Sequence, residues 1–592
     1  MCGIFAVIED KQNQAAQTVL AGLKKLEYRG YDSWGIAIKP MGGSTIQVDK
    51  HVGKIGIATT SLPDGSVAIG HTRWATHGGV TDTNAHPHLD CKKQIAVIHN
   101  GIVENYHELK IELIKKGHSF ISETDTEVIA HLVEEKRKTM DLEEAVFSTF
   151  RELVGSNAIV VLDYQTGSVI ACRNGSPLVV GFSPKETFLA SDTTAFLNKT
   201  NSVYYLNDNE AVVVSKNERR IFDLIKQSYI SFKKQTVDWT LEDTEKGGFP
   251  HFLLKEIMEE KKTIPQAFDS NKKTVEHVIK KMVSGYTPLL LGCGSAYYCA
   301  LAAHYYFAQL GIDSKVVGGY EYLPFEKSIS NKSIVFAISQ SGETADTLIP
   351  AKEAKKRGAI VVAIVNSRGS SLERLADVTL PVGAGPEISV VSTKAFTAQL
   401  ATLYAVANQY YERKPHTGLI RSSTQLKSKL KHWLNASLMS TVLNIAKRLL
   451  SEEHAYVIGK YNNYPAALEF ALKLKETSYM HAEAFAAGEL KHGVITLIQK
   501  GTPCFIMTDS GPSYGEICSS ASQMKARGGY IIGVGPTRSP LFDEWIQTPD
   551  VDPRYSIFLN VIVGQLLGYY LGVGRGADPD KPRNLAKSVT VK

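Results

Sequence analysis

The stretch Ile334-Val335-Phe336-Ala337-Ile338-Ser339-Gln340-Ser341-Gly342-Glu343-Thr344 decides how the second half of this chain is interpreted. Its apolar run, bounded by turn-forming residues, is typical of a strand buried in a parallel sheet. The polar residues follow at the carboxyl end of that strand and open a helix, which is where doubly wound sheets bind ligands. Helix N–H groups and clustered hydroxyls favour an anion, most simply a phosphate, although serine and threonine also serve as ordinary helix caps.

The same pattern occurs a second time further along the chain. The apolar run 288–291 ends in Gly292-Cys293-Gly294-Ser295, and the run 455–459 takes the corresponding place in the second copy. The loop Ser339-Gln340-Ser341-Gly342 likewise corresponds to Thr508-Asp509-Ser510-Gly511. A repeat of strand, turn and helix predicts two domains of one kind, each built on a doubly wound parallel sheet.

The first half of the chain shows a different pattern. Short apolar runs, expected to be strands, are separated by segments with helical periodicity such as residues 127–136; the runs are 67–69, 95–98, 158–162 and 211–214. This predicts an α/β fold with α+β layers. Residues 216–273 are charged and polar, and they predict a linker region with a helix near 252–260.

Length, charge and cysteine usage exclude several classes of function. The chain has 592 residues, a net charge of +6 and no long basic tract, so we expect about three domains and no nucleic-acid partner. Its seven cysteines include no C-x-x-C pair, which indicates a reducing, cytoplasmic location. The longest apolar stretch, residues 556–574, contains Asn560 and Gln565 and predicts a buried helix rather than a membrane span.

Charged residues in the second half recur at helical spacing. Glu469, Lys473 and Glu476 are spaced i, i+4 and i+7, which by itself is typical of a solvated face with a Glu–Lys pair. The alanine and leucine residues around them indicate instead a packed helix, whose polar groups need partners or a function. His492 follows in a glycine-flanked segment and is a candidate proton carrier at physiological pH.

The amino terminus opens Met1-Cys2-Gly3-Ile4-Phe5. Once Met1 is removed, Cys2 carries both a thiol and a free α-amine, with reference pKa values of about 8.5 and about 7.7–8.0. The neutral amine can take the thiol proton near neutral pH, so one residue supplies a nucleophile and its base. Taken alone, however, the segment favours a small buried cysteine at the start of an apolar strand.

Polar motifs elsewhere in the first half each have a functional and a structural interpretation. Arg73 suits a carboxylate ligand or a structural ion pair, and Asn100-Gly101 suits an oxyanion hole or a tight turn. Thr124-Asp125-Thr126-Glu127 matches a helix capping box, in which Asp125 is only a first-turn charge. Four histidines of this half suggest a zinc site, namely His71, His77, His86 and His88. No cysteine or carboxylate at ligand spacing completes a site with them, so we expect no metal and no cofactor.

Lys587 lies in the short, half-apolar tail 582–592 at the end of the chain. A docked lysine with a depressed pKa can form a Schiff base with a carbonyl substrate. A frayed surface lysine is the simpler interpretation of a terminal segment.

Taken together, these segments resemble the glutamine–fructose-6-phosphate aminotransferase (isomerising) family, the glucosamine-6-phosphate synthases, over nearly the whole chain. The resemblance rests on Met1–Ile4, Glu27–Ser33, His71–Gly78, Asn84–His88, Ser339–Thr344, Ser392–Phe396, Gly488–Gly493 and the tail. It implies an N-terminal-nucleophile αββα glutaminase (class II glutamine amidotransferase) domain followed by two sugar isomerase (SIS) domains. The implied boundaries are 2–220 for the glutaminase, 221–275 for a linker, 276–420 and 440–582 for the isomerase domains, and 583–592 for a tail that closes the sugar site.

The resemblance also implies a reaction and the residues for its first step. The enzyme would hydrolyse L-glutamine and pass the ammonia to fructose 6-phosphate, isomerising it to glucosamine 6-phosphate for hexosamine synthesis. Cys2 would attack the amide, and Asn100 and Gly101 would hold the oxyanion. The other glutamine-site residues would be Arg29, Arg73, Trp74 at the mouth of an ammonia channel, Thr76, His77 and Asp125.

For the isomerase half, the resemblance implies three catalytic residues. Lys587 would form the sugar imine, Glu476 would move a proton between C1 and C2, and His492 would support ring opening. His492 would reach the site from a neighbouring subunit, so a homodimer is implied. The sugar-phosphate site would contain Ser295, Ser339, Gln340, Ser341, Thr344, Ser392 and Lys473, with Glu469 as a supporting charge.

Two positions depart from the family pattern. Ala296 stands where the family has a phosphate-binding serine, which Ser295 would replace, and Trp34 stands where a small residue is usual. One neutral hydrogen bond contributes about 0.5–1.5 kcal/mol, so we expect weaker substrate binding rather than lost function.

Three other functions share part of this pattern. A glutaminase that aminates or deaminates a different ketose or amino-sugar phosphate would keep every motif. A purine-pathway glutaminase would also start at Cys2, but the isomerase repeat argues against it. A sugar-phosphate sensor would not need the catalytic residues of both halves.

Overall fold

The structure, a computed structural model, describes residues 2–9, 13–216, 218–237, 243, 245–413 and 420–589, without the side chains of 420–422. Removal of Met1 and the last three residues of the tail therefore lie outside the described residues. The chain divides into two units, one of Met1–Thr244 with Glu343–Ala345 and Ala586–Lys592, the other of Glu245–Gly342 and Asp346–Leu585.

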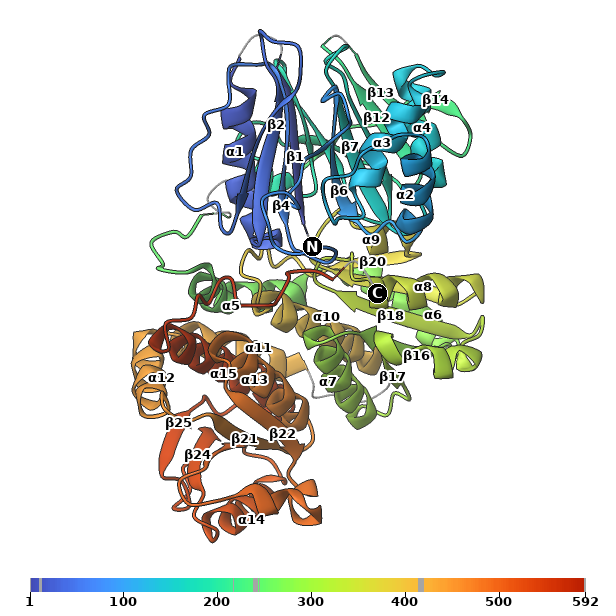
Figure 1. Ribbon diagram of the computed structural model, residues 1–592. Helices are drawn as coiled ribbons and strands as arrows, with labels where there is room; N and C mark the ends of the chain where they lie inside the picture. The colour runs from blue at the N-terminus through green and yellow to red at the C-terminus, as the bar shows by residue number, and fades with distance from the viewer. Residues whose placement is uncertain are drawn as a thin grey trace. The chain divides into compact units, whose positions relative to one another are not determined.

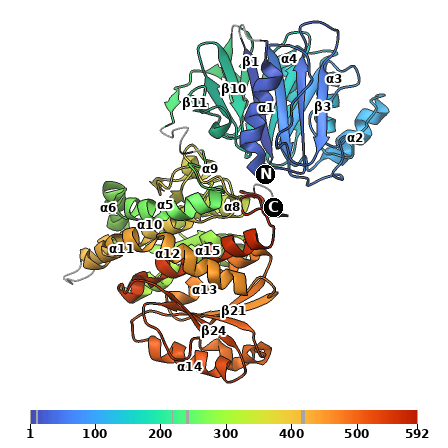
Figure 2. The same ribbon diagram turned by 90° about the vertical axis from the view of Figure 1, so that its left-hand side faces the viewer.

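The first unit is a sandwich of two antiparallel sheets between helices (Figure 1). One sheet has the strand order β15-β11-β9-β10-β1-β4-β2-β3, and the other has β14-β13-β12-β8-β7-β6-β5. Helix α1 covers the outer face of the first sheet, and α2, α3 and α4 lie on the outer side of the second (Figures 1 and 2).

The bounds of these elements are β1 Gly3–Glu9, α1 Ala15–Leu26, β2 Ser33–Lys39, β3 Gln47–Val52, β4 Val67–Arg73, β5 His88–Leu89, β6 Ile95–Gly101, α2 Tyr106–Lys115, α3 Glu127–Lys136, α4 Leu142–Glu152, β7 Asn157–Asp163, β8 Val169–Asn174, β9 Val179–Phe182, β10 Glu186–Ala190, β11 Ser202–Tyr205, β12 Glu210–Val214, β13 Arg219–Asp223, β14 Ser228–Ile230 and β15 Gln235–Thr236.

Successive side chains of each strand point to opposite faces of the sheet, and this alternation explains the layers of the unit. Ile4, Ala6 and Ile8 of β1 face the core between the two sheets, and Ala96 and Ile98 of β6 meet them from the other side. Ile95 and Val97, which alternate with them along β6, face the helices instead, in a core shared with α3 and α4. Both faces of these strands are thus buried, and for this reason the runs are almost continuously apolar.

The second unit contains two parallel sheets of the same topology, with the strand orders β17-β16-β18-β19-β20 and β22-β21-β23-β24-β25. In chain order both read 2-1-3-4-5, so the internal repeat and the doubly wound folds predicted from the sequence are confirmed. The elements are α5 Phe252–Asp269, α6 Lys272–Val283, β16 Thr287–Gly292, α7 Ser295–Gln309, β17 Lys315–Gly318, β18 Ser333–Ser339, α8 Ala345–Lys356, β19 Ile360–Val365, α9 Ser371–Leu375, β20 Val378–Pro381, α10 Lys394–Glu412, α11 Ile420–Trp433, α12 Ala436–Arg448, β21 His454–Gly459, α13 Asn463–Ser478, β22 His481–Ala486, β23 Pro503–Met507, α14 Tyr514–Lys525, β24 Tyr530–Gly535, β25 Glu544–Gln547 and α15 Ser556–Gly574.

Each parallel sheet is covered on both faces. Leu290 and Phe336 face a large core formed with α7 and α10, while Leu289 and Val335 face a smaller core under α8. In the second copy, α13 and α15 lie on one face and α14 on the other (Figure 2). Residues 553–574 form a helix long and apolar enough to cross a membrane, but 83% of its most apolar window is buried, as predicted for a core helix.

The interpretation of residues 221–275 as a linker is too broad. Strands β14 and β15 and most of β13 lie in this segment and belong to the two sheets of the sandwich, and Ile221 of β13 is buried in the core between the sheets. Helix α5 extends to Asp269, beyond the expected end at residue 260, and Leu253 and Ile257 pack into the large core of the second unit.

Candidate active sites

Cys2 lies at an edge of the sandwich, directly before β1. Gly3 pairs with Thr72 of β4, so the end of β4 brings Trp74 alongside Cys2. The backbone N–H of Trp74 donates a hydrogen bond to the Cys2 thiol sulfur at 3.2 Å. Cys2 is half-buried, and burial raises the pKa of its thiol, while the Trp74 N–H and the Arg73 guanidinium act in the opposite direction. Cys2 directly precedes β1 and, unlike Ile4 and Ala6 of that strand, it is only half-buried.

The Asn100 side chain, on β6, also contacts Cys2. Its Nδ2 donates to the Cys2 carbonyl oxygen at 3.0 Å, and its Oδ1 lies 3.0 Å from His71 Nε2. Burial lowers the pKa of His71 to about 3, so this ring is neutral and orients the amide by donating to Oδ1. Asn100 and Gly101 pair with Ala158 and Asn157 of β7, so the tight-turn interpretation is wrong.

Arg73 and Asp125 each make backbone contacts in the described structure. The Arg73 guanidinium donates to the carbonyl oxygens of Gly79 at 3.1 Å, Gly78 at 3.2 Å and also His77, so it orders the loop after β4 rather than forming a structural ion pair. Burial lowers the pKa of Arg73, whereas Cys2 and Asp125 nearby raise it. Asp125 Oδ2 accepts from the Val103 N–H at 2.7 Å.

The predicted capping box before α3 does not form. Thr126 is the residue before α3 and makes no side-chain cap. The Glu127 carboxylate instead accepts from the backbone N–H groups of Ile121 at 2.9 Å and Ser122 at 2.7 Å. Thr124 is buried, and its hydroxyl bonds His88 Nε2 at 2.9 Å instead of capping the helix.

The remaining expected glutamine-site residues lie at different depths. Arg29 Nε donates to the Cys2 carbonyl at 3.4 Å, and its Nη1 forms an ion pair with Asp192 at 3.2 Å. Trp74 and His77 are half-buried, with His77 edge-on to Tyr106, while Thr76 is exposed.

Sequence reasoning missed three residues that support this site. Asp32 accepts from Ala75 N at 2.8 Å and so holds the segment after β4; its signal was the Tyr-Asp-Ser motif. His71 orients Asn100, and Asp192 holds Arg29 from 163 residues away, for which the sequence carries no signal.

The second site lies at the switch point of the first parallel sheet, where β16 and β18 are neighbours. Ser295 opens α7 after β16, and Ser339 ends β18. Ser339 Oγ accepts from the Gly342 N–H at 2.9 Å, and the Gln340 carbonyl accepts from Asn366 N at 3.1 Å, so the loop is held at both ends. Gly342 has φ 67°, and a Cβ there would lie 2.2 Å from Ser370 Oγ.

Lys473 is the centre of a buried charge cluster on α13. Its Nζ lies 3.2 Å from Glu469 Oε1 and 2.6 Å from Glu476 Oε2, and it donates to Ser295 Oγ at 3.2 Å and to the Ser392 carbonyl at 3.1 Å. The Glu469 and Lys473 side chains are 0% and 1% exposed, so the solvated-face interpretation is wrong.

The electrostatics of this cluster follow from its burial. Burial raises the pKa of Glu469 to about 7, although Lys473 opposes the shift. For Lys473, burial alone would lower the pKa, but the carboxylates of Glu469 and Glu476 outweigh it and raise the pKa. The ammonium is therefore retained across the physiological range, whereas Glu469 can exchange a proton near neutral pH.

The other expected sugar-site residues are not all brought to this cluster. Ser341 and Thr344 are half-buried, and His492 is exposed and makes no hydrogen bond to another described residue. Lys587 is half-buried, Ser588 is buried, and the Val589 carbonyl accepts from Ala345 N at 3.0 Å, so this part of the tail is docked rather than frayed.

The two residues that depart from the family pattern, Trp34 and Ala296, both pack against neighbouring side chains. Trp34 is buried on β2, and its ring lies 4.7 Å from the His51 ring. Ala296 packs against the large core beside Ser295, whose hydroxyl already bonds Glu469 Oε1 at 3.0 Å.

Comparisons with known proteins agree with this geometry. The glutamine amidotransferase domain family matches residues 71–198, and the SIS domain family matches residues 287–409 and 448–541. The chain is therefore a glutamine amidotransferase joined to a pair of sugar isomerase domains. A glutamine–fructose-6-phosphate aminotransferase [isomerizing] of Thermococcus kodakarensis is 41% identical over 100% of both chains, and one of Pyrococcus horikoshii is 42% identical over 100% of both.

Among solved structures, the C-terminal domain of glucosamine-fructose-6-phosphate aminotransferase from Francisella tularensis matches with a TM-score of 0.52 and 28% identity, covering 57% of this chain and 99% of that one. The chain belongs to the glutamine–fructose-6-phosphate aminotransferase (isomerising) family. It uses L-glutamine and D-fructose 6-phosphate and yields L-glutamate and D-glucosamine 6-phosphate. The α/β fold and the function predicted from the sequence are confirmed.

Proposed function

We propose that Cys2, with its α-amine freed by removal of Met1, is the nucleophile of glutamine hydrolysis. The observation that carries this proposal is the convergence of the Cys2 thiol, the Trp74 N–H and the Asn100 amide at the ends of three strands. The amine takes the thiol proton, the thiolate attacks the amide carbon, and the proton passes to the departing ammonia. Water then releases glutamate from the thioester.

Asn100 and Gly101 stabilise the oxyanion of this step, and charged groups hold the substrate. Arg73 binds the glutamine carboxylate and Asp125 its α-amine, with Thr76 and His77 beside them and Arg29 ordering the Cys2 backbone. The electrostatic influence of Cys2, Asp125 and Asp32 on Arg73 supports their proximity. Trp74 lies at the mouth of an ammonia channel, which keeps ammonia from being protonated in water.

In the isomerase half, Ser295, Ser339, Gln340, Ser341, Thr344 and Ser392 bind the sugar phosphate. Lys587 forms an imine with the open-chain ketose, and Glu476 transfers a proton between C1 and C2 of the sugar. Lys473 holds the Glu476 carboxylate at 2.6 Å and fixes its direction. The tail 583–592 closes over the sugar.

His492 assists ring opening at the site of a second subunit, so the enzyme is a cytoplasmic homodimer that binds no nucleic acid. The exposure of His492 supports this arrangement, because its side chain bonds no residue that the structure describes and can therefore serve another subunit. Mixing Glu476→Gln and His492→Ala variants should then restore about one quarter of the activity, since half of the dimers are mixed and each has one intact site. Activity that stays at the level of either variant alone would refute a shared site.

The nucleophile is tested by Cys2→Ala with Cys518→Ala as the matched control. Cys2→Ala should abolish glutamate formation and retain ammonia-dependent synthesis of glucosamine 6-phosphate, identified by mass and chromatography. Cys518→Ala should retain both reactions. Mass spectrometry of the intact chain should show that active enzyme begins at Cys2, and full glutaminase activity in a chain that keeps Met1 would refute the proposal.

A further inference from the structure

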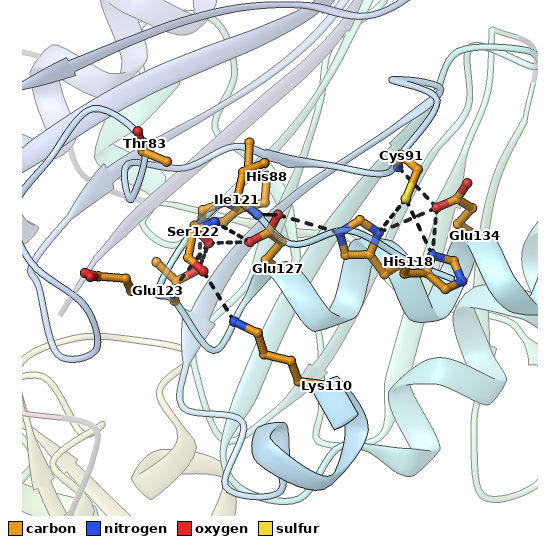
Figure 3. Close-up of polar contacts among 12 residues, drawn as sticks. Thr83, His88, Cys91, Lys110, His118, Ile121, Ser122, Glu123, Glu127 and Glu134 are labelled. Carbon is orange, nitrogen blue, oxygen red and sulfur yellow. Dashed lines mark hydrogen bonds and ion pairs between the residues drawn. The ribbon is translucent and has the colours of Figure 1, made fainter. Parts of the chain in front are cut away.

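A second group of chemically distinctive side chains lies in the first unit, away from Cys2. Four potential ligand atoms come within 4.8 Å of one another: Cys91 Sγ, His118 Nδ1, His131 Nδ1 and a Glu134 carboxylate oxygen. They come from the turn between β5 and β6, the segment after α2, and two positions on α3. Figure 3 shows the sulfur of Cys91 and the carboxylate of Glu134 directed toward His118.

The distances between these atoms match the edges of a tetrahedral zinc site. With Zn–S near 2.3 Å and Zn–N or Zn–O near 2.0–2.1 Å, tetrahedral angles give S–N edges of about 3.5 Å and N–O edges of about 3.4 Å. Cys91 Sγ lies 3.7 Å from His118 Nδ1 and 3.5 Å from His131 Nδ1. Glu134 Oε2 lies 3.1 Å from His118 Nδ1 and 3.5 Å from His131 Nδ1.

The far side of each imidazole provides independent support. His118 Nε2 lies 3.0 Å from Glu135 Oε2, and His131 Nε2 lies 3.6 Å from Glu127 Oε1. At His118 this carboxylate fixes the proton on Nε2 and leaves the Nδ1 lone pair directed at the cluster, the arrangement usual for zinc-bound histidines. His131 Nε2 faces its carboxylate at ion-pair distance without a hydrogen bond. Both histidine side chains are buried, so water does not compete for these lone pairs.

We propose that Cys91, His118, His131 and Glu134 bind a zinc ion. Thiolate, imidazole and carboxylate together favour zinc over the harder magnesium and calcium ions. Four protein ligands fill a tetrahedral shell, so the ion has no open position for substrate, and the site is structural. It joins the β5–β6 turn, the segment after α2 and the helix α3, which are distant in sequence. The histidines considered from the sequence, His71, His77, His86 and His88, take no part in it.

The proposal is tested by metal analysis of the purified full chain. Protein produced with zinc in the medium should contain about one zinc per chain. Cys91→Ser and His131→Ala should lose it, whereas Cys518→Ser should keep it, and Cys2→Ala should keep it because the ion is not at the glutaminase site. Cys91 is exposed, so its replacement by serine leaves the packing of the unit intact.

Two further measurements keep the test independent of folding in the variants. Blocking thiols of the native protein with a mercurial should release zinc to a colorimetric chelator. Cobalt(II) added to metal-free protein should give a thiolate charge-transfer band that is absent in Cys91→Ser. Absence of bound zinc in the native chain with no uptake of added zinc, or equal zinc content in Cys91→Ser, would overturn the proposal in favour of a hydrogen-bonded thiol–imidazole cluster.

Discussion

Replacing Lys473 with methionine isolates the energetics of the buried charge cluster on α13. The change keeps the length of the side chain but removes the ammonium that lies 3.2 Å from Glu469 and 2.6 Å from Glu476. Removing one partner of a buried ion pair costs about 3–5 kcal/mol, because the remaining charge stays buried and uncompensated. With about 2–4 °C per kcal/mol for domains of about 150–250 residues, the melting temperature of the isomerase unit should fall by about 6 °C or more.

The loss of stability caused by Lys473→Met should depend on pH, and the protonation of Glu469 sets the direction of this dependence. The pKa of Glu469 in the folded chain, about 7, lies above its ordinary value of 4.5. The folded state therefore binds more protons between these values, and the free energy of unfolding falls as pH rises from about 4.5 through about 7. Without Lys473 the pKa of Glu469 rises further, so the loss of stability should be smaller at pH 5, where Glu469 is protonated in both proteins, than at pH 8.

The assay is calorimetric unfolding of the full chain at pH 5 and pH 8, with two controls. Lys475→Met changes an exposed lysine on the same helix and should alter stability by no more than about 0.5 kcal/mol. Glu469→Gln combined with Lys473→Met removes both charges and should recover more than half of the loss. A deficit in Lys473→Met that is the same at both pH values, or equal to that of Lys475→Met, would refute the reasoning.

Three further substitutions test the sites and the second unit. Asn100→Ala should lower glutamine-dependent kcat by about 10²–10³ with ammonia-dependent synthesis retained, measured by glutamate and sugar product; equal loss in both assays would contradict an oxyanion role. Gly101→Ala should lower the melting temperature of the first unit far more than Gly117→Ala. Both glycines have positive φ, but only at Gly101 would a Cβ meet backbone, 2.1 Å from Ser156 O, and similar shifts would argue against this clash. Arg575→Met should destabilise the second unit by about 2 kcal/mol or more in thermal unfolding, because the guanidinium bonds carbonyls that include those of Ser478 and Leu450; a change no larger than that of the exposed Arg413→Met would contradict this.

Local pattern predicted the long elements of this fold well. The helix expected at residues 127–136 has the bounds of α3, and the helix expected at 556–574 has the bounds of α15. Strands β17 and β22 were not predicted, because the first has only four residues and the second alternates small and polar side chains. Their place in the sheets comes from pairing with β16 and β21, which is a tertiary contact.

Chemistry that depends on contacts between distant segments was harder to predict. The flanking alanine and leucine residues predicted a packed helix for Glu469, Lys473 and Glu476, but only the fold shows that α7 and α15 bury these charges. Similarly, Cys91 and His131 are separated by 40 residues, so no short motif reveals that their ligand atoms are neighbours. Motif spacing identifies sites on one element, whereas sites assembled from several elements require the fold.

The two copies of the isomerase repeat differ at the loop that follows β18 in the first copy and β23 in the second. Asp509 takes the place of Gln340 in the second copy, and its carboxylate accepts from the Gly511 N–H at 2.7 Å and from Asn463 Nδ2 at 2.8 Å. In the second copy a buried carboxylate of the chain itself thus accepts from the loop glycine, whereas in the first copy the neutral Ser339 hydroxyl accepts from the corresponding Gly342 N–H. Because a buried carboxylate in the second loop would repel a phosphate, we expect one sugar phosphate per chain, bound at the Ser339–Gly342 loop. The second copy contributes instead the α13 charges, since Lys473 reaches across to Ser295 and the Ser392 carbonyl. The two copies have therefore diverged: the first carries the Ser339–Gly342 loop proposed to bind the sugar phosphate, and the second carries the charged helix α13.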